Sequence, residues 1–253
     1  MIFSTFRRQT SQVFRLKKEK QSQLFLSAVF SIKFAAQFQD MEETIRRVIE
    51  QEAQAIRNIP VNDSFQKAVE LIYNRVHQQN GKLVASGMGK AGQIALNIAT
   101  TFSSTGTPSV FLHPSDSQHG DLGIVQKNDI LLLISNSGKT REIIELVQLA
   151  DNLYPNLPLI LISSNPEGEL AKKADVFIFT GNPTEVCPLG LSPTTSTTVM
   201  TVIGDALVVS MMEKIGFTSE DYAKRHHGGY LGDKSREKAK EKAQAESNST
   251  GLS

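Results

Sequence analysis

Short apolar runs alternate with segments of helical length from Lys82 onward. Five runs stand out: Leu83–Ala85, Ser109–Leu112, Ile130–Ile134, Leu159–Ile162 and Val176–Phe179. Runs with so little polar alternation are typical of parallel strands that are buried on both faces. Parallel strands are joined by right-handed crossovers, so the pattern predicts a single α/β domain. We expect a doubly wound five-stranded parallel sheet of order 2-1-3-4-5, flanked by helices.

Helical periodicity precedes and follows this region. Apolar residues recur at spacings of three and four over 41–49 and again over 68–76. A break at 58–60 separates these two segments into two helices. After the last strand, the pattern predicts a long helix over Thr194–Lys214 and a short one that begins at Ser219.

Both ends of the chain differ from this core. Residues 1–40 carry seven basic and two acidic side chains, whereas residues 41–232 carry 15 basic and 20 acidic ones. A basic stretch followed by a short apolar run is compatible with a targeting peptide. We favour a disordered extension, because Met41 opens a clean helical pattern and would serve as the functional start. Residues 233–253 form a charged tail, so the folded domain is expected over 41–232.

Charge and composition exclude several classes of protein. The net charge is +1 and the expected domain is acidic, whereas nucleic-acid-binding proteins usually carry a basic body. No apolar run approaches the roughly 20 residues needed to span a bilayer. Cys187 is the only cysteine, so an intramolecular disulfide is impossible. We therefore expect a cytoplasmic protein without a nucleic-acid or membrane partner.

The loop after the first strand, Ser86-Gly87-Met88-Gly89-Lys90-Ala91-Gly92, opens a helix. Ligands of open α/β sheets bind at the carboxyl ends of the strands, where glycines admit an anion and a helix N-terminus supplies N–H groups. The G-x-G-x-x-G spacing is also compatible with a dinucleotide-binding loop, which is the competing interpretation. The acid expected after the second strand is missing, however, since Phe111-Leu112-His113-Pro114 stands there. We favour anion contacts at Ser86, Gly87 and Gly89.

A second loop, Ser135-Asn136-Ser137-Gly138-Lys139-Thr140, follows the third strand and also opens a helix. Its hydroxyl groups, its glycine and the helix N-terminus can together hold a phosphate without a metal. The alternative is an ordinary helix cap, since Ser and Thr cap helices anyway. The density of hydroxyl groups favours phosphate binding by Ser135, Asn136, Ser137 and Thr140. We refer to residues 135–140 as the serine loop.

Four side chains are candidates for acid–base chemistry: His119, Glu142, Glu185 and His226. Each has an ordinary alternative. Glu142 would favour a helix N-terminus through the helix dipole alone, and a lone loop histidine is usually a surface hydrogen-bonding residue. The five histidines show no zinc-ligand spacing, so we expect no metal and no other cofactor.

Taken together, these loops resemble the sugar isomerase (SIS) domain, whose phosphate-binding loop is similar to the serine loop. The region from about Met41 to Gly232 resembles the arabinose 5-phosphate isomerase family more specifically. The stretches that carry this resemblance are SGMGKAG at 86–92, SSTGTPS at 103–109, HGDLG at 119–123, ISNSG at 134–138, CPLGLSPTTSTT at 187–198, GDAL at 204–207 and GFTSEDYAKRHHGGYLG at 216–232.

The resemblance implies an aldose–ketose isomerase that interconverts ribulose 5-phosphate and arabinose 5-phosphate through an enediol. This reaction feeds synthesis of Kdo, an acid sugar of lipopolysaccharide and some capsules. The family's proposed catalytic positions fall on Lys90, Glu142, Glu185 and His226, and His119 falls at the mouth of the site. Another SIS phosphosugar isomerase and a non-catalytic sugar-phosphate regulator are the alternatives.

The resemblance also suggests a role for each group. Either Glu142 or Glu185 would transfer the proton. His226 would open the sugar ring or shuttle the hydroxyl proton, and Lys90 would stabilise oxyanion charge. His227 stands where the family often has proline, so the choice between His226 and His227 stays open.

Two further expectations concern partners and regulation. SIS domains use neighbouring subunits to complete the site, which predicts a homotetramer. Many family members continue into paired CBS modules, whereas here a charged tail follows Gly232 and Lys139 replaces a usually acidic residue. We expect regulation to be independent of such modules, and CMP-Kdo, an anionic pathway product, is a candidate feedback ligand.

Overall fold

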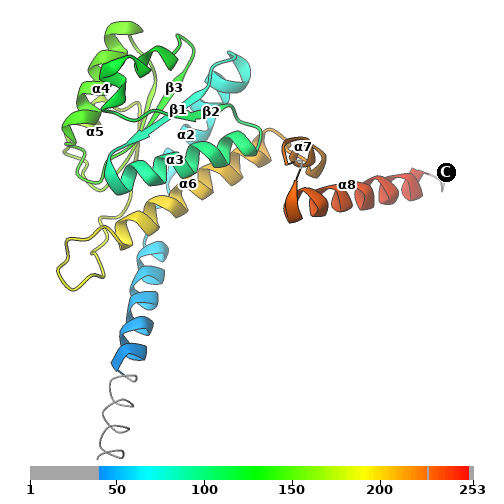
Figure 1. Cartoon of the computed structure of the whole chain (residues 1–253), viewed down its shortest axis with the longest axis horizontal. Coiled ribbons are helices and arrows are strands. Elements are labelled where there is room, and N and C mark those ends of the chain that lie inside the picture. The colour runs from blue at the N-terminus through cyan, green and yellow to red at the C-terminus, as the bar shows by residue number, and fades with distance from the viewer. Residues whose placement is uncertain (1–39, 227, 251–253) are drawn as a thin grey trace, which may run out of the picture. The chain divides into compact units, whose positions relative to one another are not determined.

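The computed structural model describes residues 40–226 and 228–250. Its strands form one parallel sheet in the order β2-β1-β3-β4-β5 (Figure 1). The strands are β1 (Leu83–Gly87), β2 (Ser109–Phe111), β3 (Ile130–Ile134), β4 (Leu159–Ser163) and β5 (Val176–Phe179). The predicted fold class and strand order are confirmed.

Helices precede, connect and follow these strands. They are α2 (Asp63–Ile72), η1 (Tyr73–Gln78), α3 (Gly89–Ser104), η2 (Asp116–His119), η3 (Asp121–Ile124), α4 (Arg141–Leu153), α5 (Glu169–Lys173), α6 (Thr195–Lys214), α7 (Ser219–Arg225) and α8 (Gly229–Thr250). A further helix covers 40–57, and the chain divides into the compact units Met1–Gln51 and Glu52–Ser253. The expected extension lies outside the described residues except for Asp40, and so does His227.

The sheet is buried on both faces because two apolar layers cover it. Alternate residues of a strand point to opposite faces, so a strand covered on both sides must be apolar throughout. All five residues of β3 are at most 2 % exposed. One hydrophobic cluster joins the sheet to α2, α3 and α6, and the other joins it to α4 and α5. This arrangement leaves the carboxyl ends of the strands open for loops.

Helix α6 is long and apolar enough to cross a membrane by length and composition, yet half of it is buried inside the fold. It lies beside α3 (Figure 1). A Cβ atom at Gly204 would stand 2.3 Å from Cδ1 of Ile98, so the missing side chain allows the two helices to approach. These contacts are those of a core helix.

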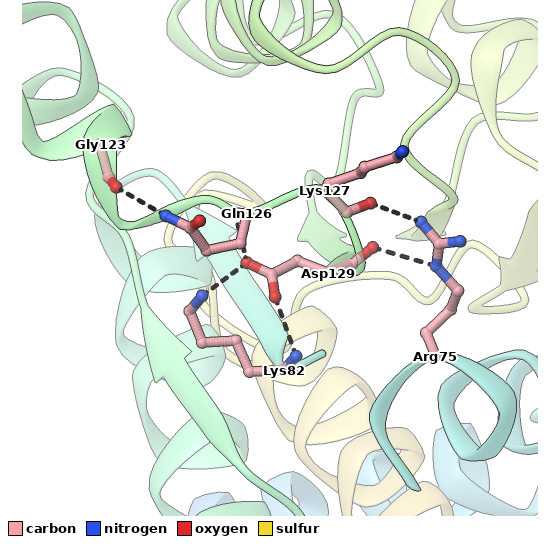
Figure 2. Close-up of polar contacts among 6 residues, drawn as sticks. All are labelled: Arg75, Lys82, Gly123, Gln126, Lys127 and Asp129. Atoms are coloured by element: carbon pink, nitrogen blue, oxygen red, sulfur yellow. Dashed lines mark hydrogen bonds and ion pairs between the residues drawn. The ribbon is translucent and has the colours of Figure 1, made fainter. Parts of the chain in front are cut away.

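A buried carboxylate joins the amino ends of β1 and β3 (Figure 2). Asp129 is 1 % exposed. Its Oδ1 accepts from the backbone N–H of Lys82 at 2.9 Å. Its Oδ2 accepts from the backbone N–H of Gln126 at 2.7 Å and from Nζ of Lys82 at 2.6 Å. Asp175, directly before β5, similarly accepts from the N–H of Leu159, the first residue of β4, at 2.8 Å.

We expect Asp129→Ala to lower the free energy of unfolding by about 3 kcal/mol. The substitution leaves two N–H groups and a half-buried ammonium without their acceptor, and removing one partner of a buried pair typically costs this much. Urea denaturation measures the change. Lys67→Ala is the matched control, because its ion pair with Asp63 is exposed and such pairs contribute about 0–1 kcal/mol. Equal losses of unfolding free energy in both variants would contradict this stabilising role of Asp129.

Candidate functional site

Strands β2 and β3 pair with opposite sides of β1. The strand order therefore reverses direction between β1 and β3. Such a switch point opens a crevice at the carboxyl ends of the strands. A cavity of about 360 Å³ lies there. Its lining comprises Met88, Lys90, Ala91, Ile134, Ser135, Asn136, Ser137, Thr140, Glu185, Gly190, Leu191, Pro193, Ser196, Thr197 and Met200.

The glycine loop positions α3 at this cavity through backbone contacts. A Cβ at Gly92 would stand 2.5 Å from the carbonyl oxygen of Gly87, and a Cβ at Gly87 would stand 2.8 Å from that of Ala91. Gly89 adopts a φ of +60°, which few other residues tolerate. The hydroxyl of Ser86 is buried and donates to the carbonyl of Leu112 at 2.6 Å. Ser86, Gly87 and Gly89 therefore shape the loop from outside the cavity lining.

Lys90 is the cation of the cavity. It is the second residue of α3, its side chain is exposed, and it forms no ion pair within the described chain. Its ammonium group and the uncapped N-terminus of α3 place positive charge at one wall of the cavity. An anionic ligand or a developing oxyanion would be stabilised there.

The serine loop also lines the cavity. The hydroxyls of Ser135 and Thr140 hydrogen-bond to each other at 2.8 Å, and Oγ of Ser137 accepts from the N–H of Lys139 at 3.2 Å. Thr140 is the N-cap of α4, yet no side chain caps this helix. The hydroxyls therefore do not act as the ordinary cap, and the first turn of α4 keeps the N–H groups that an anion accepts from.

Glu185 lines the cavity and also binds the start of α6. One carboxylate oxygen accepts from the backbone N–H of Thr194 at 2.7 Å, from its hydroxyl at 2.9 Å and from the N–H of Ser196 at 3.3 Å. The other accepts from the hydroxyl of Ser196. Burial raises the pKa of Glu185, but the hydrogen bonds from Ser196 and Thr194 outweigh it, so the pKa lies below its usual value.

Three predicted residues lie outside this cavity lining. Glu142 is half-buried in the first turn of α4, and His119 is exposed at the end of η2. His226 caps the C-terminal end of α7, where its ring stacks on Tyr222 with centroids 3.7 Å apart and Nδ1 lies 3.1 Å from the carbonyl oxygen of Tyr222. Within one chain, the structure thus unites Lys90 and Glu185 with the serine loop but leaves these three apart.

Sequence reasoning missed two contributors to the site. Ser196, Thr197 and Met200 of α6 line the cavity. The loop over 163–168 hydrogen-bonds to the serine loop. That loop follows β4 at the same edge of the sheet, so the rule for strand ends would have found it. Among the described residues, no group of three or more His, Cys, Asp or Glu is arranged to hold a metal ion.

Known proteins share this fold. The family model that describes the SIS domain matches residues 76–210 of this chain. Arabinose 5-phosphate isomerase KdsD of Yersinia pestis is 45 % identical over 197 residues, which are 77 % of this chain and 58 % of the relative. The chain thus spans somewhat more than half the length of this curated relative.

Two solved structures extend the comparison. A putative phosphosugar isomerase involved in capsule formation from Bacteroides fragilis is 66 % identical with a TM-score of 0.74, over 75 % of this chain and 99 % of that one. A protein of E. coli CFT073 in complex with arabinose 5-phosphate is 34 % identical with a TM-score of 0.69, over 74 % and 97 %. With its five-stranded parallel sheet and serine loop, this chain belongs to the SIS domain family.

Proposed function

We propose that this protein is an aldose–ketose isomerase that interconverts ribulose 5-phosphate and arabinose 5-phosphate. One observation carries the proposal: a single cavity at the switch point holds an uncapped helix N-terminus with its serine loop, an ammonium group and a carboxylate. The first binds a phosphate, and the other two suit proton transfer beside a carbonyl. The similarity to KdsD and to the E. coli protein that binds arabinose 5-phosphate supports this substrate.

The phosphate group belongs at the serine loop, where the first turn of α4 supplies N–H donors. The reacting carbons then lie toward Lys90 and Glu185, which line the same cavity. We assign proton transfer to Glu185, because it lines the cavity and Glu142 does not. Geometry outranks pKa in this choice, since a base must first reach the proton. Lys90 stabilises the negative charge of the enediolate.

His226 enters this proposal through a second copy of the chain. Its own chain holds it on α7, away from the cavity lining, so ring opening or proton shuttling by His226 requires a neighbouring subunit. The outer surface favours association. Val209 on α6 is 54 % exposed, and Leu189 and Leu191 beside the cavity are 77 % and 78 % exposed. We propose a homotetramer in which such apolar side chains are covered.

The involvement of the Bacteroides fragilis relative in capsule formation suggests the pathway. We place the reaction in the cytoplasm, upstream of Kdo synthesis for capsule or lipopolysaccharide. CMP-Kdo, which carries both a sugar acid and a phosphate, would act as feedback ligand at the same cavity. Titration calorimetry tests this part separately, and a lack of binding heat removes CMP-Kdo from the proposal.

Ser137→Ala should raise KM for ribulose 5-phosphate by about ten- to a hundred-fold, with a smaller effect on kcat. A hydrogen bond to a charged group is worth roughly 1.5–3 kcal/mol, and the phosphate is bound equally in ground and transition states. Steady-state kinetics give both constants. Ser103→Ala is the matched control, an exposed serine on α3. If KM stays unchanged in Ser137→Ala, the phosphate does not lie at this hydroxyl.

Glu185→Gln should lower kcat by about 10²–10⁴, the range for general acid–base catalysis. The amide keeps the shape of the side chain but loses its basicity. Glu142→Gln should have a smaller effect, because its side chain lies outside the cavity lining. Turnover of ribulose 5-phosphate and calorimetric binding of arabinose 5-phosphate measure the two properties separately.

The reverse order of effects would transfer the base role to Glu142. Near-normal turnover in both variants and in His226→Ala would contradict the catalytic assignment. A protein that binds arabinose 5-phosphate without turning it over would instead be a sugar-phosphate regulator. A thermal melt of Glu185→Gln is needed beside the kinetics, since its carboxylate also binds the start of α6.

The protein should sediment at micromolar concentration as a species of four times the chain mass of 27.8 kDa. Val209→Lys should shift it toward smaller species, because a charge buried in an apolar contact is costly. Gln148→Lys on α4 adds the same charge at an exposed polar position and should leave assembly intact. A wild-type monomer would contradict both the tetramer and the route by which His226 reaches the site.

A further inference from the structure

We propose that the loop over 163–168, which begins with the last residue of β4, holds the serine loop in its anion-binding conformation, with Asn165 as a positioning residue. The inference rests on the proposed function and adds residues to its phosphate site. None of the side chains in 163–168 lines the cavity. They act through the serine loop.

Three consecutive carbonyl groups of the serine loop face the loop over 163–168 and the helix that follows it. The carbonyl of Asn136 accepts from the backbone N–H of Ser164 at 3.2 Å, from its hydroxyl at 2.7 Å and from the hydroxyl of Ser163 at 3.1 Å. The carbonyl of Ser137 accepts from Nδ2 of Asn165 at 2.8 Å. The carbonyl of Gly138 accepts from the N–H of Leu170 at 3.2 Å.

This pairing matters because a peptide loop is polar on two sides. Its N–H groups attract a phosphate, whereas its carbonyl oxygens repel one. Donors from the loop over 163–168 satisfy the carbonyls of Asn136 and Ser137, the N–H of Leu170 in α5 satisfies that of Gly138, and all three carbonyls are held on the side of β4. The loop can then present N–H and hydroxyl groups to the cavity. An anion site with a carbonyl turned inward would lose affinity.

A glycine pair allows the two loops to come this close. A Cβ at Gly168 would stand 2.9 Å from the carbonyl oxygen of Gly138 and 3.0 Å from its Cα. Gly138 itself adopts a φ of +62°, which favours glycine. The backbones of the two loops therefore approach closely at this point, and Asn165 reaches the serine loop directly.

Asn165 supports both loops through its side-chain amide, as Ser163 does through its hydroxyl, which donates to the carbonyl of Asn136 and accepts from the N–H of Asn165 at 3.2 Å. While Nδ2 donates to the carbonyl of Ser137, Oδ1 accepts from the N–H of Glu167 at 3.1 Å and so holds the turn of its own loop. Aspartate at 165 would keep the acceptor for Glu167 but lose the donor. It would also place a negative charge beside the carbonyl of Ser137. The aspartate variant therefore separates the contact with the serine loop from the support of the turn at Glu167.

Kinetics and phosphate binding test the proposal together. Asn165→Ala should raise KM for ribulose 5-phosphate by about ten-fold, the value of one lost hydrogen bond, and change kcat less. Asn165→Asp should raise KM more, because its turn is intact but its charge opposes both the carbonyl and the phosphate. The dissociation constant for inorganic phosphate, measured by titration calorimetry, should rise in parallel in both variants. Asn152→Ala, an exposed asparagine on α4, should match the wild type.

Each result has a distinct meaning. Unchanged KM and phosphate affinity in Asn165→Asp would overturn the positioning role, and so would a loss of thermal stability with phosphate affinity unchanged. If the wild type fails to isomerise ribulose 5-phosphate, the proposed function fails. The comparison of phosphate affinities among the variants still decides the role of Asn165 in that case.

Discussion

At the end of β1, the carbonyl oxygen of Gly87 lies so close to Gly92 that a Cβ on residue 92 would stand 2.5 Å from it. This backbone contact lets α3 begin directly against the strand, and β3 pairs along the other side of β1. The starts of α3 and α4 therefore meet at the same edge of the sheet. As a result, Lys90 and the serine loop line one cavity. Any side chain at either glycine would push α3 outward and widen the site.

The site is built from loops that constrain one another in pairs. The loop over 163–168 holds the carbonyls of the serine loop, and Glu185 holds the start of α6. In both cases a polar group from one loop satisfies backbone groups that this contact would otherwise leave without a protein partner. Asp129 and Asp175 do the same at the opposite edge of the sheet. Preorganised donors cost little reorganisation when a charged ligand binds, which is why such pairs suit a phosphate site.

The sheet and the location of the site follow from the sequence, because both depend on local pattern. The apolar runs define buried strands, and the rule for carboxyl ends then selects the loops at 86–92 and 135–140. What individual side chains do depends on contacts between distant positions, which no periodicity encodes. The hydroxyl of Ser86 is taken by Leu112, 26 residues away. Asn165 reaches Ser137 over 28 residues. The placement of His226 outside the cavity lining follows from the packing of α7, which its sequence does not reveal.

Glu185 binds the start of α6 with the same carboxylate to which we assign proton transfer. Four hydrogen bonds from Thr194 and Ser196 lower its pKa, so at neutral pH it is ionised and stabilises the start of α6. Since the folded-state pKa lies below the unfolded one, this contribution is present above the unfolded pKa. It is lost as the pH falls through the folded-state value. The same bonds make the carboxylate a weaker base than a free glutamate. In the proposed reaction the substrate carbon acid would therefore have to be held close and its enediolate stabilised, and Lys90, which lines the same cavity, is the group that could do this.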